Sequence, residues 1–125
     1  MSVKFMICRR CGNQVEVLHD SGVPMMCCGQ KMDVLEPNTV EASAEKHLPV
    51  VTRDGGNLVV EVGSVAHPMI PEHYIEWIYV ETSTGGRRVD LQPGQDPKVT
   101  FCLCGEEPVA VYAYCNLHGL WMTKL

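Results

Sequence analysis

The sequence has no long hydrophobic run and few aromatic residues. Phenylalanine, tryptophan and tyrosine make up 6% of its 125 residues. No apolar stretch approaches the roughly 18 residues that a membrane-spanning helix needs. The first ten residues also lack the apolar segment of a secretory signal peptide. We therefore expect a protein with no membrane segment that works in the cytoplasm.

Basic residues are scarce as well. Ten lysines and arginines stand against fifteen aspartates and glutamates, which gives a formal net charge of -5. Proteins that bind nucleic acids usually carry a basic stripe, whereas the pairs Arg9-Arg10 and Arg87-Arg88 are isolated. The sequence therefore argues against a nucleic-acid partner.

Cysteine, by contrast, is abundant. The chain has seven cysteines, and in a reducing compartment such clusters point to metal binding more than to disulfides. Four of them lie in the first 36 residues, a segment too short to support a hydrophobic core of its own. We expect residues 1–36 to form a small metal-bound domain. A second domain should cover residues 37–125, with the boundary near Glu36, Pro37 and Asn38.

The second domain has the pattern of an all-β protein. Four short runs are rich in β-branched and aromatic residues: Leu58–Val62, Tyr74–Val80, Val99–Leu103 and Val109–Tyr114. Turn signals separate them at Gly55-Gly56, Gly85-Gly86, Pro93-Gly94 and Gly105. No helical period lies between, so the spacing predicts an antiparallel sandwich or barrel. The run Tyr74–Val80 is apolar on both faces except at Glu76, which is typical of a central strand.

The first candidate metal site consists of four cysteines. Cys8 and Cys11 form a Cys-x-x-Cys pair, and the adjacent pair Cys27 and Cys28 follows after fifteen intervening residues. Four thiolates can enclose one tetrahedral ion, and both zinc and iron accept four sulfurs. Because zinc ribbons are common, the spacing alone favours zinc. The adjacent second pair is unusual for a zinc ribbon, which leaves the metal open at this point.

The second candidate site consists of four histidines and one cysteine. They are His47, His67, His73, Cys115 and His118, and each histidine lies at an expected strand end or turn. A single histidine in such a place is usually a core or surface residue. If all five converge, four imidazoles and one thiolate suit iron better than zinc, which rarely takes five protein ligands. The thiolate would donate electron density to the metal, as it does in haem-thiolate enzymes.

The motifs around these residues closely resemble those of desulfoferrodoxin, the two-iron superoxide reductase family. They are Glu45-Lys46-His47, Ala66-His67-Pro68-Met69, His73-Tyr74-Ile75-Glu76-Trp77 and Tyr114-Cys115-Asn116-Leu117-His118-Gly119. The four N-terminal cysteines resemble the desulforedoxin-like domain of that family. The resemblance extends over essentially the whole chain.

The resemblance implies a fold, a set of metal ligands and an activity. Residues 37–125 would form an immunoglobulin-like β-sandwich in a homodimer. Iron would replace zinc as the expected metal of the four-cysteine site, which would be of the rubredoxin type. At the second site His47, His67, His73 and His118 would form the equatorial plane of a catalytic iron, with Cys115 axial. That iron would reduce superoxide to hydrogen peroxide without releasing oxygen, which detoxifies reactive oxygen.

The resemblance also implies roles for Lys46 and Glu45 beside the catalytic iron. Lys46 would attract the superoxide anion, and Glu45 would bind ferric iron after turnover. An electron donor such as a rubredoxin would restore the ferrous state. Two other readings of the residues remain: a two-iron electron-transfer protein with no substrate of its own, and a zinc-stabilised binding module.

Two features depart from the family pattern. The first is the pair Cys102 and Cys104, and the second is the tail Leu120–Leu125, where a polar or histidine-containing tail is expected. Residues two apart on a strand face the same side, with Cα atoms about 6.6 Å apart. This separation is at the outer limit for a disulfide. We expect Cys102 and Cys104 to be buried or partly buried free thiols.

Overall fold

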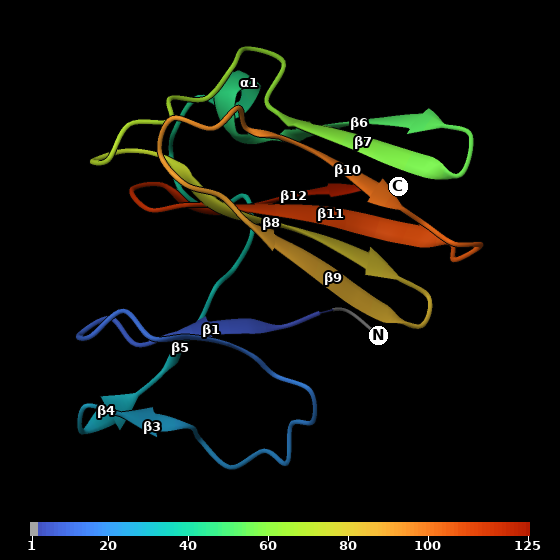
Figure 1. Ribbon diagram of the computed structural model, residues 1–125. Coiled ribbons are helices and arrows are strands. Elements are labelled where there is room, and N and C mark those ends of the chain that lie inside the picture. The colour runs from blue at the N-terminus through green and yellow to red at the C-terminus, as the bar shows by residue number, and fades with distance from the viewer. Residues whose placement is uncertain (1–2) are drawn as a thin grey trace. The chain divides into compact units, whose positions relative to one another are not determined.

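The computed structural model describes residues 3–125 and divides into two compact units, Met1–Glu36 (unit 1) and Pro37–Leu125 (unit 2). Both consist of antiparallel strands, and unit 2 adds one short helix (Figure 1). Among residues 3–125, no helix is both long enough and apolar enough to cross a membrane. Because strands make up nearly all of the regular structure, the expectation of an all-β protein is confirmed.

Unit 1 is built from strands of only two or three residues. One sheet has the order β2-β1-β5, with β1 at Phe5–Ile7, β2 at Gln14–Glu16 and β5 at Asp33–Val34. A separate hairpin pairs β3 (Met26–Cys27) with β4 (Gln30–Lys31). The buried apolar side chains are few: Phe5, Ile7, Cys8, Met32 and Leu35. So small a core gives little hydrophobic stabilisation, which fits a fold that depends on a metal.

Unit 2 is a sandwich of two antiparallel sheets. The first sheet has the order β10-β7-β6, with β6 at Pro49–Asp54, β7 at Asn57–Val62 and β10 at Lys98–Cys102. The second has the order β12-β11-β8-β9, with β8 at Ile75–Thr82, β9 at Gly85–Asp90, β11 at Pro108–Cys115 and β12 at Gly119–Lys124. The chain changes sheets after β7, β9 and β10, as in immunoglobulin-like folds (Figure 1).

The core of unit 2 lies between the two sheets. It is formed by the inward-facing side chains of β7, β8, β10 and β11, among them Leu58, Val60, Ile78, Phe101 and Val111. Strand β8 lies between β11 and β9, and six consecutive residues from Trp77 are buried. The prediction of a central strand over Tyr74–Val80 is thereby confirmed.

In unit 2, the strands absent from the sequence-based prediction are β6, β9 and β12, which all lie at sheet edges. The glycines Gly85 and Gly86 belong to β9, and the turn before them is formed by Ser83 and Thr84. Gly86 lies under the Tyr79 ring, where a Cβ atom would overlap the phenol. Gly86 therefore marks a close approach of a side chain to the backbone, and the turn that we expected at the glycine pair lies directly before it.

The expectation of buried thiols at Cys102 and Cys104 is wrong. Both side chains are exposed. Leu103 between them is buried, at 4% exposure, and carries the inward-facing position of the segment. The chain leaves β10 at Cys102 and turns at Cys104, so Leu103 alone points inward while Cys102 and Cys104 lie at the surface.

Candidate metal centres

The first candidate centre begins with the turn that follows β1. Cys8 comes directly after β1, and its carbonyl accepts a hydrogen bond from the Gly12 N–H at 2.8 Å. The Cys8 N–H donates to the Asn13 carbonyl, also at 2.8 Å. These bonds close a tight turn that brings Cys8 and Cys11 into one cluster of sulfur atoms.

A hairpin turn explains how two adjacent cysteines can serve the same centre. Cys27 ends β3, and Cys28 and Gly29 form the two-residue connection to Gln30 at the start of β4. Cys28 has a φ of 52° and Gly29 a φ of 74°. Two successive positive φ values are typical of the type I′ turn of tight hairpins. The left-handed backbone at Cys28 turns its side chain back toward Cys27.

The spacing of the four sulfur atoms fits a tetrahedral ion. The Sγ atoms of Cys8, Cys11, Cys27 and Cys28 all lie within 4.8 Å of one another. Cys11 Sγ is 3.6 Å from Cys27 Sγ, which is 4.0 Å from Cys28 Sγ. A tetrahedral ion with metal–sulfur bonds of about 2.3 Å places its sulfurs about 3.8 Å apart. All four thiols are free of disulfides, so all are available as ligands.

The electrostatics of this centre also favour a bound cation. The backbone N–H of Cys11 is the main cause that lowers the pKa of Cys8 to about 6. Hydrogen bonds among the sulfurs, chiefly with Cys11, raise the pKa of Cys28 to about 12. Without a cation, the first thiolate therefore opposes ionisation of the others. A metal ion offsets this repulsion and allows four thiolates to coexist.

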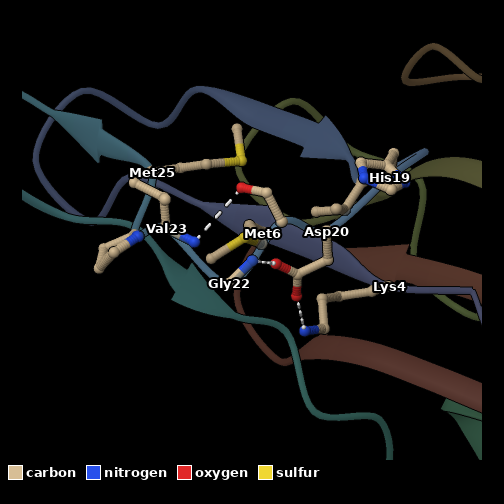
Figure 2. Close-up of a pocket in the computed structure, with 10 residues that line it drawn as sticks. Lys4, Met6, His19, Asp20, Gly22, Val23 and Met25 are labelled. Atoms are coloured by element: carbon tan, nitrogen blue, oxygen red, sulfur yellow. Dashed lines mark hydrogen bonds and ion pairs between the residues drawn. The ribbon is translucent and has the colours of Figure 1, made fainter.

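A pocket elsewhere in unit 1 does not include these cysteines. It is lined by ten residues between Lys4 and Met25, and its polar contacts centre on Asp20 (Figure 2). Asp20 accepts hydrogen bonds from the Lys4 ammonium at 2.9 Å and the Gly22 N–H at 2.8 Å. The hydrogen bond from Lys4 is the main cause that lowers the pKa of Asp20. These hydrogen bonds hold the segment between β2 and β3 in place, and the polar residues of the pocket therefore have a structural role.

The second candidate centre gathers five residues from separate segments of unit 2. His47 ends the helix α1 (Ala44–His47), His67 follows β7, and His73 precedes β8. Cys115 ends β11, and His118 lies in the turn to β12. His47, His67 and Cys115 are buried, whereas His73 and His118 are half-buried. The strand ends thus place the donors at one edge of the sandwich.

The four imidazole rings are arranged as a square. Neighbouring centroids lie 4.6 Å apart for His47 and His67, 4.6 Å for His67 and His73, 5.1 Å for His73 and His118, and 4.9 Å for His118 and His47. The diagonal between His47 and His73 is longer, at 6.4 Å. Cys115 Sγ lies within 4.8 Å of ring nitrogens of His47, His67 and His73, and 3.9 Å from His118 Nδ1.

Backbone hydrogen bonds fix which ring nitrogens face the centre. His47 Nδ1 lies 2.7 Å from the Ser43 carbonyl, and His67 Nδ1 lies 2.7 Å from the Pro68 carbonyl. Because a carbonyl only accepts, both Nδ1 atoms carry the proton, and both Nε2 atoms bear lone pairs. These Nε2 atoms lie only 3.1 Å apart, and His118 Nδ1 is 3.1 Å from His47 Nε2. Lone pairs this close repel unless a cation lies between them, so the donor set fits a metal ion.

Burial favours, for three of the imidazoles, the neutral form that metal binding requires. Desolvation is the main cause that lowers the pKa of His67 to about 4, and it also lowers the pKa values of His47 and His73. His73 Nε2 is buried with no hydrogen-bond partner. A buried nitrogen without a partner costs free energy, which a metal bond would recover.

Comparison with known proteins identifies the family. Residues 39–124 match the family model described as desulfoferrodoxin. A desulfoferrodoxin homolog of Archaeoglobus fulgidus is 47% identical over 116 residues, which cover 93% of this chain and 92% of that protein. The chain belongs to the desulfoferrodoxin family.

Relatives named superoxide reductase share the fold and part of the sequence. The solved superoxide reductase from Treponema pallidum has a TM-score of 0.83 and 35% identity, and covers 99% of this chain and 100% of that chain. A superoxide reductase of Pyrococcus horikoshii is 33% identical over 99 residues, which cover 65% of this chain and 86% of that protein.

Within this desulfoferrodoxin fold, Trp121 supports two of the histidines, a role that the sequence analysis missed. Its ring stacks on His47 with centroids 5.0 Å apart and an interplanar angle of 27°. Its Nε1–H donates to the His118 carbonyl at 3.1 Å. Trp121 belongs to the tail that departs from the expected polar pattern. The sequence offered one signal of this supporting role: Trp121 follows the candidate ligand His118 by three residues.

Lys46 and Glu45 lie on α1, directly before His47. Lys46 is half-buried and Glu45 is exposed. After burial and the charge of His118, the positive charge of Lys46 is the next cause that lowers the pKa of His73. The positive charge of Lys46 therefore acts on His73, the ring diagonally opposite its neighbour His47.

The position of α1 depends on a close approach of Gly63. A Cβ atom at Gly63 would come within 2.5 Å of the Glu45 carbonyl oxygen and 3.0 Å of the Leu48 carbonyl oxygen. The Glu45 carbonyl also accepts hydrogen bonds from the Val65 N–H at 3.0 Å and the Ser64 hydroxyl at 3.1 Å. The loop after β7 thus holds α1, and with it Lys46, against the centre.

Proposed function

We propose that this protein is a superoxide reductase, which converts superoxide to hydrogen peroxide and thereby detoxifies reactive oxygen. The observation that carries the proposal is the square of four imidazoles with one thiol in a desulfoferrodoxin fold. Such a donor set matches iron chemistry better than a structural zinc site, which is closed by four ligands. Superoxide, one electron and two protons together give hydrogen peroxide.

Each unit has its own part in this proposal. Unit 1 would be a desulforedoxin-like domain that holds one iron ion through Cys8, Cys11, Cys27 and Cys28. Unit 2 would be the catalytic domain, with a second iron ion held by His47, His67, His73, His118 and Cys115. Ferrous iron at the second centre would supply the electron for the reduction. The Ser43 and Pro68 carbonyls hold the imidazoles in the tautomer that presents Nε2.

Lys46 would guide the substrate to the centre, and Glu45 would act afterwards. Superoxide is an anion, and the overall charge of -5 repels it. A positive side chain beside a ligand reverses that field locally and raises the rate of association. The exposed carboxylate of Glu45 lies one residue earlier and would bind the centre in its oxidised form.

The remaining expectations on partners stay predictions. A rubredoxin or a similar one-electron donor would restore the reduced centre. We also expect a homodimer that works in the cytoplasm.

The decisive experiment measures superoxide consumption and metal content in the same preparation. The purified chain should contain about two iron ions and should consume superoxide without oxygen release. Oxygen release would indicate dismutation, and failure to consume superoxide would leave an electron-transfer protein. Zinc as the bound metal in both centres would contradict the proposal altogether.

Replacing Lys46 by methionine should slow the reaction with superoxide about tenfold at low ionic strength. Methionine keeps the length of the aliphatic side chain but removes the positive charge beside His47. Because salt screens electrostatic steering, the difference from the wild type should shrink as the salt concentration rises. Pulse radiolysis at several ionic strengths measures both effects.

Lys124→Met is the matched control for this experiment. It makes the same change in net charge at an exposed residue that ends β12. Its rate should stay close to that of the wild type, and so should the rate of Glu45→Ala. Equal slowing in Lys46→Met and Lys124→Met would assign the effect to net charge and not to a local patch.

A further inference from the structure

Two cysteines at the end of β10 belong to neither metal centre. Cys102 is the last residue of β10, and Cys104 follows in the next turn. Both are exposed, and their sulfur atoms lie 3.3 Å apart. Within residues 3–125, neither cysteine belongs to a cluster of three or more potential metal ligands. Any chemical role of this pair must therefore be one that two thiols can perform without further metal ligands.

The backbone brings these two sulfurs closer than a regular strand would. Cys104 has a φ of 52° and is followed by Gly105 with a φ of 81°, so the chain turns back on itself there. The Leu103 N–H donates to the Gly56 carbonyl at 2.9 Å, and the Leu103 carbonyl accepts from the Glu106 N–H at 3.0 Å. The buried Leu103 side chain thus anchors the segment while both thiols remain in reach of solvent.

The surroundings make the two thiols unequal. The hydrogen bond between the two thiols is the main cause that lowers the pKa of Cys102, and the Arg87 guanidinium lowers it further. Arg87 is held there by a hydrogen bond from its Nη1 to the Cys102 carbonyl at 2.7 Å. The pKa of Cys104 is raised, chiefly by its hydrogen bond to Cys102, and Glu106 adds to this effect. Arg87 is bound to the Cys102 backbone and Glu106 acts on Cys104, so the thiolate is favoured at Cys102 and we take Cys102 as the nucleophile of the pair.

We propose that Cys102 and Cys104 form a redox-active dithiol that closes to a disulfide when it meets a small hydroperoxide such as hydrogen peroxide. A disulfide bond is about 2.05 Å long, so the sulfurs must approach by little more than 1 Å. Rotation of two exposed side chains can supply this movement. A chain that produces hydrogen peroxide would form the oxidant itself, but the proposal does not depend on that activity.

The oxidation proceeds in two balanced steps. The Cys102 thiolate attacks one peroxide oxygen, the O–O bond breaks, hydroxide leaves, and Cys102 becomes a sulfenic acid. The Cys104 thiol then attacks the sulfenic sulfur, the S–S bond forms, and the S–O bond breaks. The thiol proton and the hydroxyl group leave as water, and the first hydroxide takes a proton from solvent. Two electrons pass from the dithiol to the peroxide, and an added dithiol reductant restores both thiols by exchange.

The test uses the full-length, metal-loaded protein and hydrogen peroxide as the reagent. One equivalent of peroxide should remove two free thiols and the mass of two hydrogen atoms. Peptide mapping should place the new bond between Cys102 and Cys104, and dithiothreitol should reverse it. In Cys104→Ser, peroxide should instead leave a sulfenic acid at Cys102 that dimedone traps. In Cys102→Ser, the remaining Cys104 thiol should react several-fold more slowly.

The double variant Cys102→Ser/Cys104→Ser is the control for metal binding. It should keep the full metal content, because neither cysteine is a ligand in the proposal. Loss of a stoichiometric metal in that variant would overturn the dithiol in favour of a third metal site. A disulfide between two chains, or a bond that joins Cys102 to one of the metal-site cysteines, would also overturn it. So would a pair that stays reduced while those cysteines are oxidised.

Discussion

Replacing Cys115 with serine should lower the rate of superoxide reduction by more than about 100-fold. Residues that only support metal ligands cost about 10- to 100-fold when they are changed, and Cys115 would be a ligand itself. A serine hydroxyl stays protonated at neutral pH and is a poor donor to iron. Serine is also close to cysteine in size, so the fully buried position at the end of β11 remains filled. The rate constant and the metal content should be measured together.

Cys104→Ser provides the matched control for Cys115→Ser. It makes the same atomic change in unit 2, but at an exposed site. Its reaction with superoxide should proceed at the wild-type rate. If Cys115→Ser kept both its metal and its rate, the thiol would not be a donor and the centre would contain histidines alone. If Cys104→Ser were equally slow, a general sensitivity to the loss of a thiol would explain both results.

The interior strands could be predicted from sequence because their pattern comes from burial. Leu58–Val62 and Tyr74–Val80 correspond to β7 and β8, whose side chains fill the core between the sheets. The edge strand β9 carries exposed glycines and arginines, so its own sequence has no apolar pattern typical of a strand. It is a strand because it pairs with the buried strand β8. The helix α1 has four residues, too few for a helical period to be visible. Pairing across the sheet, and not local preference, determines these elements.

For the second candidate metal centre, the sequence could reveal the ligands but not their arrangement. The five donors of the second centre could be named because their types and motifs are distinctive. Their arrangement as a square could not, since it depends on how the end of α1 meets the segments next to β7, β8 and β12. The contacts of Trp121 with His47 and His118 could not be predicted either, for the same reason. At Cys102 and Cys104 the strand rule failed because it assumes extended backbone, whereas Cys104 is left-handed.

Unit 1 should lose its structure when one of its sulfur ligands is removed. Its strands have two or three residues, and few apolar side chains are buried. Binding of a structural metal by four cysteines contributes on the order of 10 kcal/mol to the folding of such small domains. That contribution exceeds what so small a core supplies. Cys11 is the informative position because it is exposed, so its replacement by serine leaves packing intact.

We therefore expect Cys11→Ser to contain about half the iron of the wild type and to reduce superoxide at a nearly unchanged rate. Trypsin should cut it rapidly at Lys4, Arg9, Arg10 and Lys31, while unit 2 stays intact. Cys102→Ser, an exposed cysteine outside both centres, should resist trypsin as the wild type does. A Cys11→Ser protein with full iron content and full resistance would show that Cys11 is not a ligand. Parallel loss of superoxide reduction, with the second centre still loaded, would show that the substrate reaction requires both irons and that the two units do not act separately.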